Sequence, residues 1–177
     1  MVTCISGSTS IRVRVESMST HAELLSQVER LAAEASDTET LMQRLADHVH
    51  SVIPRYNSVS FRLIDPLNPG TLILGPYTGS FTPQLRIPFG QGLSGTAAIT
   101  GKTIVVNNVA GDIRYLQASS IVKSEIVVPI FLRGKFTAEI DIQSYFVDTF
   151  KDPNDCSFVE SCAKVVERFM EAQSKAK

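Results

Sequence analysis

Residues 125–143 read EIVVPIFL-RGK-FTAEIDIQ, two runs of alternating apolar residues on either side of a basic turn. This alternation predicts a β-hairpin. One face of each strand is apolar: Ile126, Val128, Ile130 and Leu132 in the first, and Phe136, Ala138, Ile140 and Ile142 in the second. Residues that pair across antiparallel strands lie on the same side of the sheet, so these sets meet only if the loop has an odd number of residues. A three-residue loop at 133–135 therefore places Glu125, Asp141 and Gln143 together on the opposite face.

The segments around this hairpin predict a sheet between helices. Apolar or β-branched runs bounded by Gly, Pro or Asn predict strands at 59–63, 71–75, 84–89 and 103–107, and residues 94–100 predict a short helix. Capping boxes predict two helix starts, Thr20 with Glu23 and Ser36 with Glu39. Asp152 before Pro153 predicts the start of a last helix with an apolar stripe.

This order of elements favours an α+β fold. Strands that follow one another without regular βαβ alternation favour a mostly antiparallel sheet with the terminal helices on one face. The loops between Phe89 and Lys123 must then cover the other face, where a pocket can form. A face that is simply wet is the alternative.

The composition bounds the class of function. The 177 residues suit a single domain, and 17 basic against 18 acidic residues leave no global field to attract nucleic acid or an anionic membrane. No apolar run approaches the roughly 20 residues that span a bilayer. Three cysteines without a secretory signal favour reduced thiols and a cytoplasmic location. Residues 1–18 show no period and predict a loose arm before a single domain at 19–175.

The familiar catalytic motifs are weak or absent. Residues 90–95 match G-x-G-x-x-G, but the next predicted strand ends in Asn107 instead of an acidic residue, so a turn before a helix is favoured over a dinucleotide site. No histidine pairs with a candidate nucleophile, which leaves a triad without a base. Cys162 fits the apolar stripe of the last helix and predicts a packed thiol. We therefore expect no cofactor and no metal site.

Four ordered blocks of the chain carry a resemblance to a known family. They are LGPYTG at 74–79, RIPFGQGLSGTA at 86–97, SEIVVP at 124–129 and EIDIQS at 139–144. The stretch that contains them resembles a GAF domain, and it is most similar to the GAF-type free methionine-(R)-sulfoxide reductases. The resemblance implies a six-stranded antiparallel sheet with helices on one side and a ligand pocket on the other.

The departures from the reductase pattern concern its chemistry. Where the pattern has cysteines, this chain has Gln84, Ser94 and Ala118. The reaction needs a thiolate that attacks the sulfoxide sulfur and a second thiol that releases the product as a disulfide. A serine hydroxyl cannot complete that redox cycle.

The lining of the implied pocket also departs from the pattern. Of the acids that hold the substrate, Glu125 and Asp141 match, but the last acid is Gln143, and the pattern's Tyr is Arg62. The loss of one carboxylate and the gain of an arginine predict a less cationic ligand. One alternative is that Arg62 neutralises an acid internally, which leaves a structural salt bridge and no ligand. The other is that a bound amine or polar metabolite supplies the partner of the acid.

Three hypotheses follow. The first is a non-catalytic module that binds a small polar or amino-acid-like metabolite through residues of the pocket, namely Glu125, Asp141, Gln143, Arg62 and Ser94. The second is an enzyme, either a reductase variant that uses Cys4, Cys156 or Cys162, or another reaction in the same pocket. The third is a scaffold with a collapsed pocket that forms a homodimer through the terminal helices.

The loose arm generates the first prediction. A chain that starts at Ser19 is expected to keep the stability of the full chain, because residues 1–18 carry few large apolar side chains for the core. Urea unfolding of the two chains measures the difference. A loss of several kcal/mol on truncation would show that the arm is integral to the fold.

Overall fold

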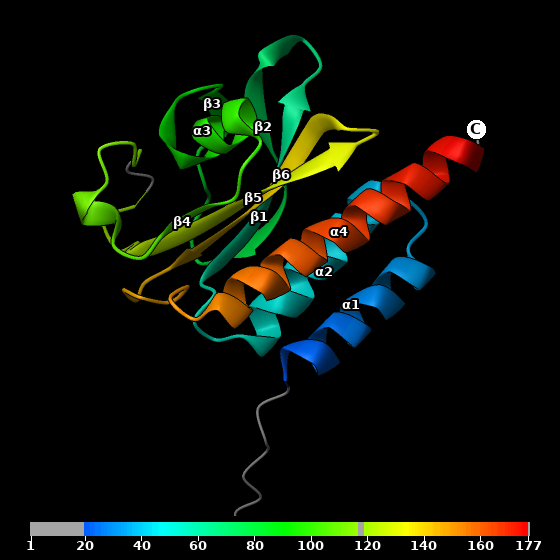
Figure 1. Cartoon of the computed structure of the whole chain (residues 1–177), viewed down its shortest axis with the longest axis horizontal. Coiled ribbons are helices and arrows are strands. Elements are labelled where there is room, and N and C mark those ends of the chain that lie inside the picture. Colours follow the sequence, from blue (N-terminus) through cyan, green and yellow to red (C-terminus); the bar gives the residue numbers. More distant parts are fainter. Residues whose placement is uncertain (1–19, 117–118, 177) are drawn as a thin grey trace, which may run out of the picture.

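A six-stranded antiparallel sheet separates three long helices from one short helix in the computed structural model, which describes residues 20–116 and 119–176 (Figure 1). The strands are β1 (Ser58–Asp65), β2 (Asn68–Gly79), β3 (Arg86–Pro88), β4 (Ile104–Val106), β5 (Ser124–Leu132) and β6 (Lys135–Ser144), in the spatial order β3-β2-β1-β6-β5-β4. The helices are α1 (His21–Glu34), α2 (Thr38–Val52), α3 (Gly92–Thr100) and α4 (Pro153–Ala176), with a 3₁₀ turn at Val109–Gly111. Among the described residues, no helix is long and apolar enough to cross a bilayer.

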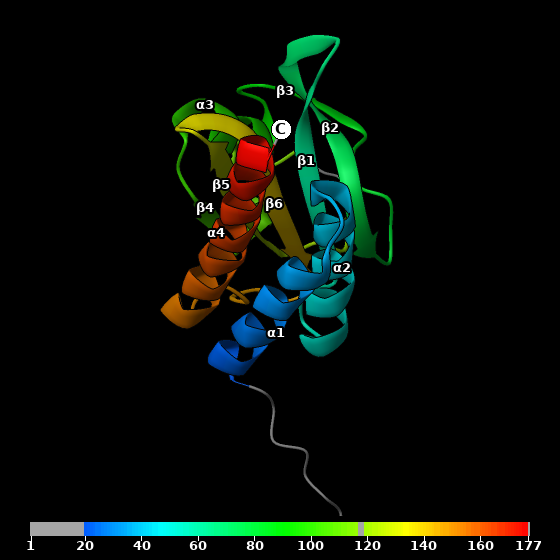
Figure 2. The ribbon, with the colours of Figure 1, turned by 90° about the vertical axis from the view of Figure 1, so that its right-hand side faces the viewer.

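The three long helices lie on one side of the sheet, as the sequence predicts (Figure 2). Helices α2 and α4 pack on its face, and α1 packs against these two helices. Their apolar stripes and the inner face of the central strands form the largest core, which contains Val28, Leu41, Leu45, Phe61, Ile126, Ile140, Phe158 and Val166. Full burial of one such side chain contributes about 1.5–3 kcal/mol, so this layer supplies much of the stability. Cys162 lies inside the same core, which confirms the prediction of a packed thiol.

The helix starts agree with the sequence at α1 and differ at α2. Thr20 and Glu23 form the expected capping box. At α2 the predicted box of Ser36 and Glu39 is wrong, because Asp37 is the N-cap and its Oδ1 accepts a hydrogen bond from the Thr40 N–H at 2.8 Å. The Ser36 hydroxyl donates to the Asp37 carboxylate instead. A charged carboxylate is an effective cap, which places this helix start at the aspartate.

The hairpin has the predicted register but not the predicted loop. Ile126 pairs with Ile142 and Val128 with Ile140. The turn has only two residues, Arg133 and Gly134, both with positive φ (52° and 75°), as in the tight turns that suit twisted strands. The parity argument still holds further along the strands, because the register shifts at a bulge between Ile130 and Phe131.

This bulge moves one aromatic residue to the other face of the sheet. Phe136 was expected beside Ala138 on the helix face, but it pairs with Phe131. Its ring packs edge-on against Phe89, with 5.8 Å between ring centroids. Phe136 therefore belongs to a small cluster on the side of α3.

The face opposite the long helices is covered by α3 and the loops around it. Leu93 and Ala97 of α3 pack on Val106 and Val127 of the sheet. The short helix approaches β3 very closely at Gly95, where an added Cβ would lie 2.5 Å from the Pro88 carbonyl oxygen. The wet-face alternative is therefore wrong for the centre of this face, which is buried.

The close approach at Gly95 generates a second prediction. Gly95→Ala should lower the free energy of unfolding by roughly 1–3 kcal/mol, because a backbone carbonyl cannot move aside as a flexible side chain can. Gly111→Ala is the matched control, since nothing lies within 4 Å of its added Cβ, and it should change stability by less than about 1 kcal/mol. Denaturant melts of both variants make the comparison, and equal effects would contradict the packing described for α3.

Candidate functional site

The central strands carry a continuous group of buried polar side chains on the face toward α3. In the observed register Ser58 lies beside Gln143, Ser60 beside Asp141 and Arg62 beside Glu139, and Glu125 of β5 lies beside Gln143. All of them are at most 4% exposed. Polar groups at this depth are costly unless they are hydrogen-bonded, so their arrangement needs a physical explanation.

Arg62 is the only cationic side chain in this group, and it makes two contacts. Its Nε donates to Asp141 Oδ2 at 3.2 Å, and its Nη1 donates to the Gln84 carbonyl oxygen at 2.8 Å. The guanidinium thus joins β6 to the loop between β2 and β3. The internal salt bridge that the sequence left as one of two alternatives is present.

A second pair lies at the other end of the same face. Gln143 Nε2 donates to Glu125 Oε2 at 3.2 Å, which confirms that the hairpin brings these residues together. No described hydrogen bond engages Gln143 Oε1. The amide is therefore only partly satisfied by the protein.

Glu139 is a buried acid of the site that the sequence analysis missed. Its exposure is 0%, and neither of its carboxyl oxygens has a hydrogen-bond partner of good geometry among the described residues. The signal was present in the sequence, because Glu139 is two residues before Asp141 and shares its face by the alternation of a strand. Glu125, Glu139 and Asp141 thus share the face with one arginine.

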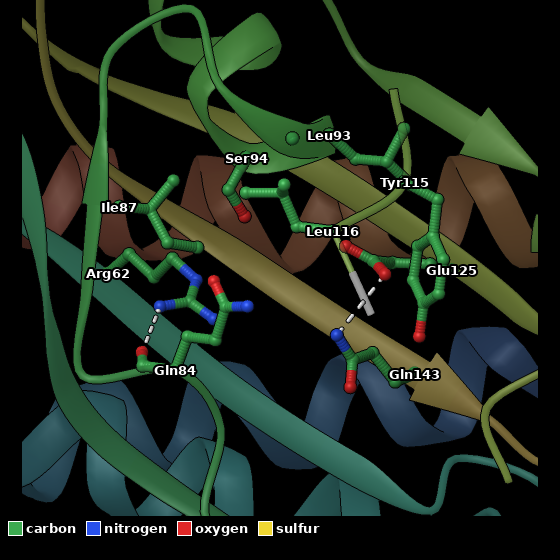
Figure 3. A pocket seen from close by; sticks show the side chains of 10 residues that line it. Arg62, Gln84, Ile87, Leu93, Ser94, Tyr115, Leu116, Glu125 and Gln143 are labelled. Atoms are coloured by element: carbon green, nitrogen blue, oxygen red, sulfur yellow. Dashed lines mark hydrogen bonds between the residues drawn. The ribbon is translucent and has the colours of Figure 1, made fainter. Parts of the chain in front are cut away.

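The polar side chains border a small cavity between the sheet, α3 and the loop before β5 (Figure 3). Its wall contains Arg62, Gln84, Ile87, Gly92, Leu93, Ser94, Tyr115, Leu116, Glu125 and Gln143. Its volume is about 10 Å³, which is room for about one water molecule. Ligands larger than water therefore require the loops over the cavity to move.

Four of the five predicted site residues lie in this wall, and one does not. Arg62, Ser94, Glu125 and Gln143 belong to the cavity wall, whereas Asp141 does not and is bonded to Arg62. Tyr115 and Leu116 were not predicted, because they come from an irregular loop whose path no sequence period indicates. Contact of these residues with a ligand stays a prediction.

Burial controls the ionisation of the three acids. It raises the pKa of Glu125 well above its ordinary value, a shift to which the nearby Asp141 adds and which Arg62 opposes. Burial likewise raises the pKa of Glu139 well above its ordinary value, against a smaller effect of the Ser94 hydroxyl. Burial also raises the pKa of Asp141, although Arg62 opposes this shift. Asp141 is the acid whose charge is balanced by direct contact, so Glu125 and Glu139 are the ones that hold their protons most strongly.

A family model of the GAF domain matches residues 37–168, well over half of the chain. The chain belongs to the GAF domain family. The match begins at the N-cap of α2, and the preceding helix α1 contributes Leu24 and Val28 to the same core.

Relatives of this GAF domain include reductases and proteins without a named activity. Protein ZMO0507 of Zymomonas mobilis is 32% identical over 149 residues, which cover 83% of this chain and 87% of that protein. The free methionine-R-sulfoxide reductase of Saccharomyces cerevisiae is 37% identical over 113 residues, 63% of this chain and 62% of that protein. The crystal structure of free methionine-R-sulfoxide reductase from Neisseria meningitidis in complex with its substrate superposes with a TM-score of 0.82 at 31% identity and covers 89% of this chain and 92% of that chain.

The raised pKa of Glu139 generates a third prediction. A folded protein that keeps a proton on an acid binds more protons than the unfolded chain, in which a glutamate has a pKa of about 4.3. Such an acid stabilises the folded protein most at pH values below the pKa that it has in the unfolded chain. As the pH rises from there toward its pKa in the folded protein, the stabilisation is lost by at most about 1.4 kcal/mol per pH unit. Glu139→Gln removes this loss, so the variant should gain stability relative to the wild type as the pH rises from acidic to neutral.

Urea melts at several pH values measure the difference between variant and wild type. Glu34→Gln is the matched control, because Glu34 is an exposed helical glutamate. It measures the effect of replacing a surface glutamate with glutamine. If the stability difference of Glu139→Gln depends on pH no more than that of Glu34→Gln, burial does not hold a proton on Glu139.

Proposed function

We propose that this GAF domain is a non-catalytic module that binds a small polar or amino-acid-like metabolite. The observation that carries the proposal is the lining of the cavity. Gln84 and Ser94, which stand where the reductase pattern has cysteines, both lie in its wall. The third such position, Ala118, lies outside the described residues. The wall therefore presents an amide and a hydroxyl where the reaction needs thiols.

The other described cysteines are poorly placed and poorly activated for this chemistry. Cys156 and Cys162 belong to α4, on the opposite side of the sheet from the cavity. Burial raises the pKa of the Cys162 thiol to about 12, and burial together with the nearby Glu160 raises the pKa of Cys156. A nucleophilic cysteine needs the opposite shift. Cys4 lies outside the described residues.

A partly satisfied polar group of the site supports ligand binding. Gln143 belongs to the cavity wall, and its Oε1 has no described hydrogen-bond partner. A buried polar ligand would supply a partner and lower the cost of its burial. Binding at this site would require the overlying loops to open, a movement of the kind by which regulatory domains transmit a signal.

Two other functions keep some support. The similarity to the yeast reductase, at 37% identity, favours an oxidoreductase with altered catalytic residues. The small volume of the cavity favours a scaffold with a collapsed pocket that pairs through its terminal helices. A ligand that binds in the cavity without being turned over is the result that only the proposed function predicts.

The reductase alternative leads to the fourth prediction. The protein should not reduce free methionine-(R)-sulfoxide in an assay with thioredoxin, thioredoxin reductase and NADPH, because its cavity wall lacks the attacking thiolate. The yeast reductase is the positive control. Turnover well above the background without enzyme would contradict the proposal, and its loss in Cys4→Ser would assign the reaction to the arm.

The ligand itself is tested by a fifth prediction. A thermal-shift screen of polar metabolites, with native mass spectrometry of the purified protein, should identify a compound that raises the melting temperature. Glu125→Gln should abolish this shift and leave the free protein at least as stable, because it replaces a buried acid with an isosteric amide. Glu34→Gln is the control that should keep the response.

The opposite pattern would favour the scaffold. If no compound shifts the wild type and Glu125→Gln loses several kcal/mol of stability, the acid has a structural role and the proposal fails.

A further inference from the structure

The first turn of α3 presents unused backbone donors at the cavity. Gly92, Leu93 and Ser94 lie in the cavity wall, and they are the first three residues of this nine-residue helix. The N-cap, Gln91, makes no capping hydrogen bond with its side chain, and the first turn contains no acidic residue. No described hydrogen bond uses the N–H of any of the three residues. Such donors, together with the helix dipole, favour an anion.

A buried cation lies in the same wall. The Arg62 side chain is only 2% exposed, and its Nε and Nη1 are engaged by Asp141 and Gln84. Among the described hydrogen bonds, none uses Nη2. A guanidinium has five N–H donors in a planar fork, so Arg62 keeps donors for a further acceptor. Figure 3 shows Ser94, at the start of α3, above this guanidinium group.

Of the nearby acids, Asp141 balances the charge of Arg62, so the attraction for an anion comes from the N–H donors that remain free. The Asp141 carboxylate accepts a hydrogen bond from Arg62 Nε and is not part of the cavity wall. Glu125 is paired with Gln143, and the buried Glu139 interacts weakly with the Ser94 hydroxyl. Burial raises the pKa of both glutamates, so they favour the neutral form that tolerates an anion nearby.

We propose that Arg62 and the first turn of α3 form a subsite for the carboxylate of a small organic acid. The inference rests on the proposed function and specifies its ligand class. The carboxylate accepts hydrogen bonds from Arg62 Nη2 and from the N–H groups of Leu93 and Ser94. The Glu125–Gln143 pair then contacts the other end of the ligand. The arginine at position 62, where the reductase pattern has a tyrosine, makes this subsite a property of this chain.

Three matched probes separate the head groups of such a ligand. Propanoate has a carboxylate and no amine, ethylammonium has an amine and no carboxylate, and L-alanine has both. Each is added to the ¹⁵N-labelled full chain at equal ionic strength, with sodium chloride as the reference for screening. Propanoate and alanine should shift the amide resonances of Gly92, Leu93 and Ser94, and ethylammonium and chloride should not.

Two variants test the donors separately. Arg62→Gln should weaken propanoate binding about tenfold or more, because it removes a charge-assisted hydrogen bond. Arg86→Gln is the control and should bind as the wild type does, since Arg86 is a half-exposed arginine paired with Asp65. Gln91→Asp should weaken propanoate binding by about fivefold, because an acidic N-cap occupies the same N–H groups.

The outcomes decide the subsite independently of the broader proposal. If Arg62→Gln does not fold, the amide shifts of the wild type and the Gln91→Asp variant still carry the test. No shift at α3 with propanoate or alanine would overturn the subsite, as would unchanged propanoate binding in a folded Arg62→Gln variant. A neutral or cationic compound that binds while propanoate does not would refute the anion subsite and leave the binding function standing. If no compound of the metabolite screen produces a response, the proposed function itself fails.

Discussion

The ion pair between Arg62 and Asp141 is the interaction on which the polar face of the sheet depends. Both side chains are almost fully buried, and their contact at 3.2 Å joins the two central strands on the side of α3. Separation of such a pair leaves an uncompensated charge in a medium of low dielectric constant. The arginine also holds the loop before β3 through the Gln84 carbonyl. The same residue therefore fixes the charge balance of the site and closes one side of its cavity.

Much of the architecture could be predicted, because it follows from periodicity. The alternation of Ile126, Val128, Ile140 and Ile142 determines which faces of the hairpin are apolar, and the structure confirms their pairing. The predicted length of the loop was wrong. A two-residue turn followed by a bulge gives these residues the same register as a three-residue loop would. Parity arguments fix faces and cannot distinguish these two solutions.

The alternation of side chains along strands also explains which residues of the site could be predicted. Arg62, Glu125 and Gln143 lie on strands, where alternation assigns a side chain to a face, and the same rule applied to residue 139 would have found Glu139. Tyr115 and Leu116 reach the cavity from irregular backbone, and no local rule predicts such a path. Asp141 was placed on the correct face, but it pairs with Arg62 and is not part of the cavity wall, which a face assignment alone cannot predict.

Burial of the polar face raises the pKa of Glu125 and of Glu139 and so favours their protonated forms. The most direct measurement is a carboxyl ¹³C NMR titration of the free protein with assigned signals for Glu125 and Glu139. We predict that Glu125 and Glu139 keep the chemical shift of the protonated acid to a pH clearly above about 4.3, the ordinary pKa of a glutamate. If both titrate near that value instead, the face is accessible to water and the site described for this GAF domain is wrong.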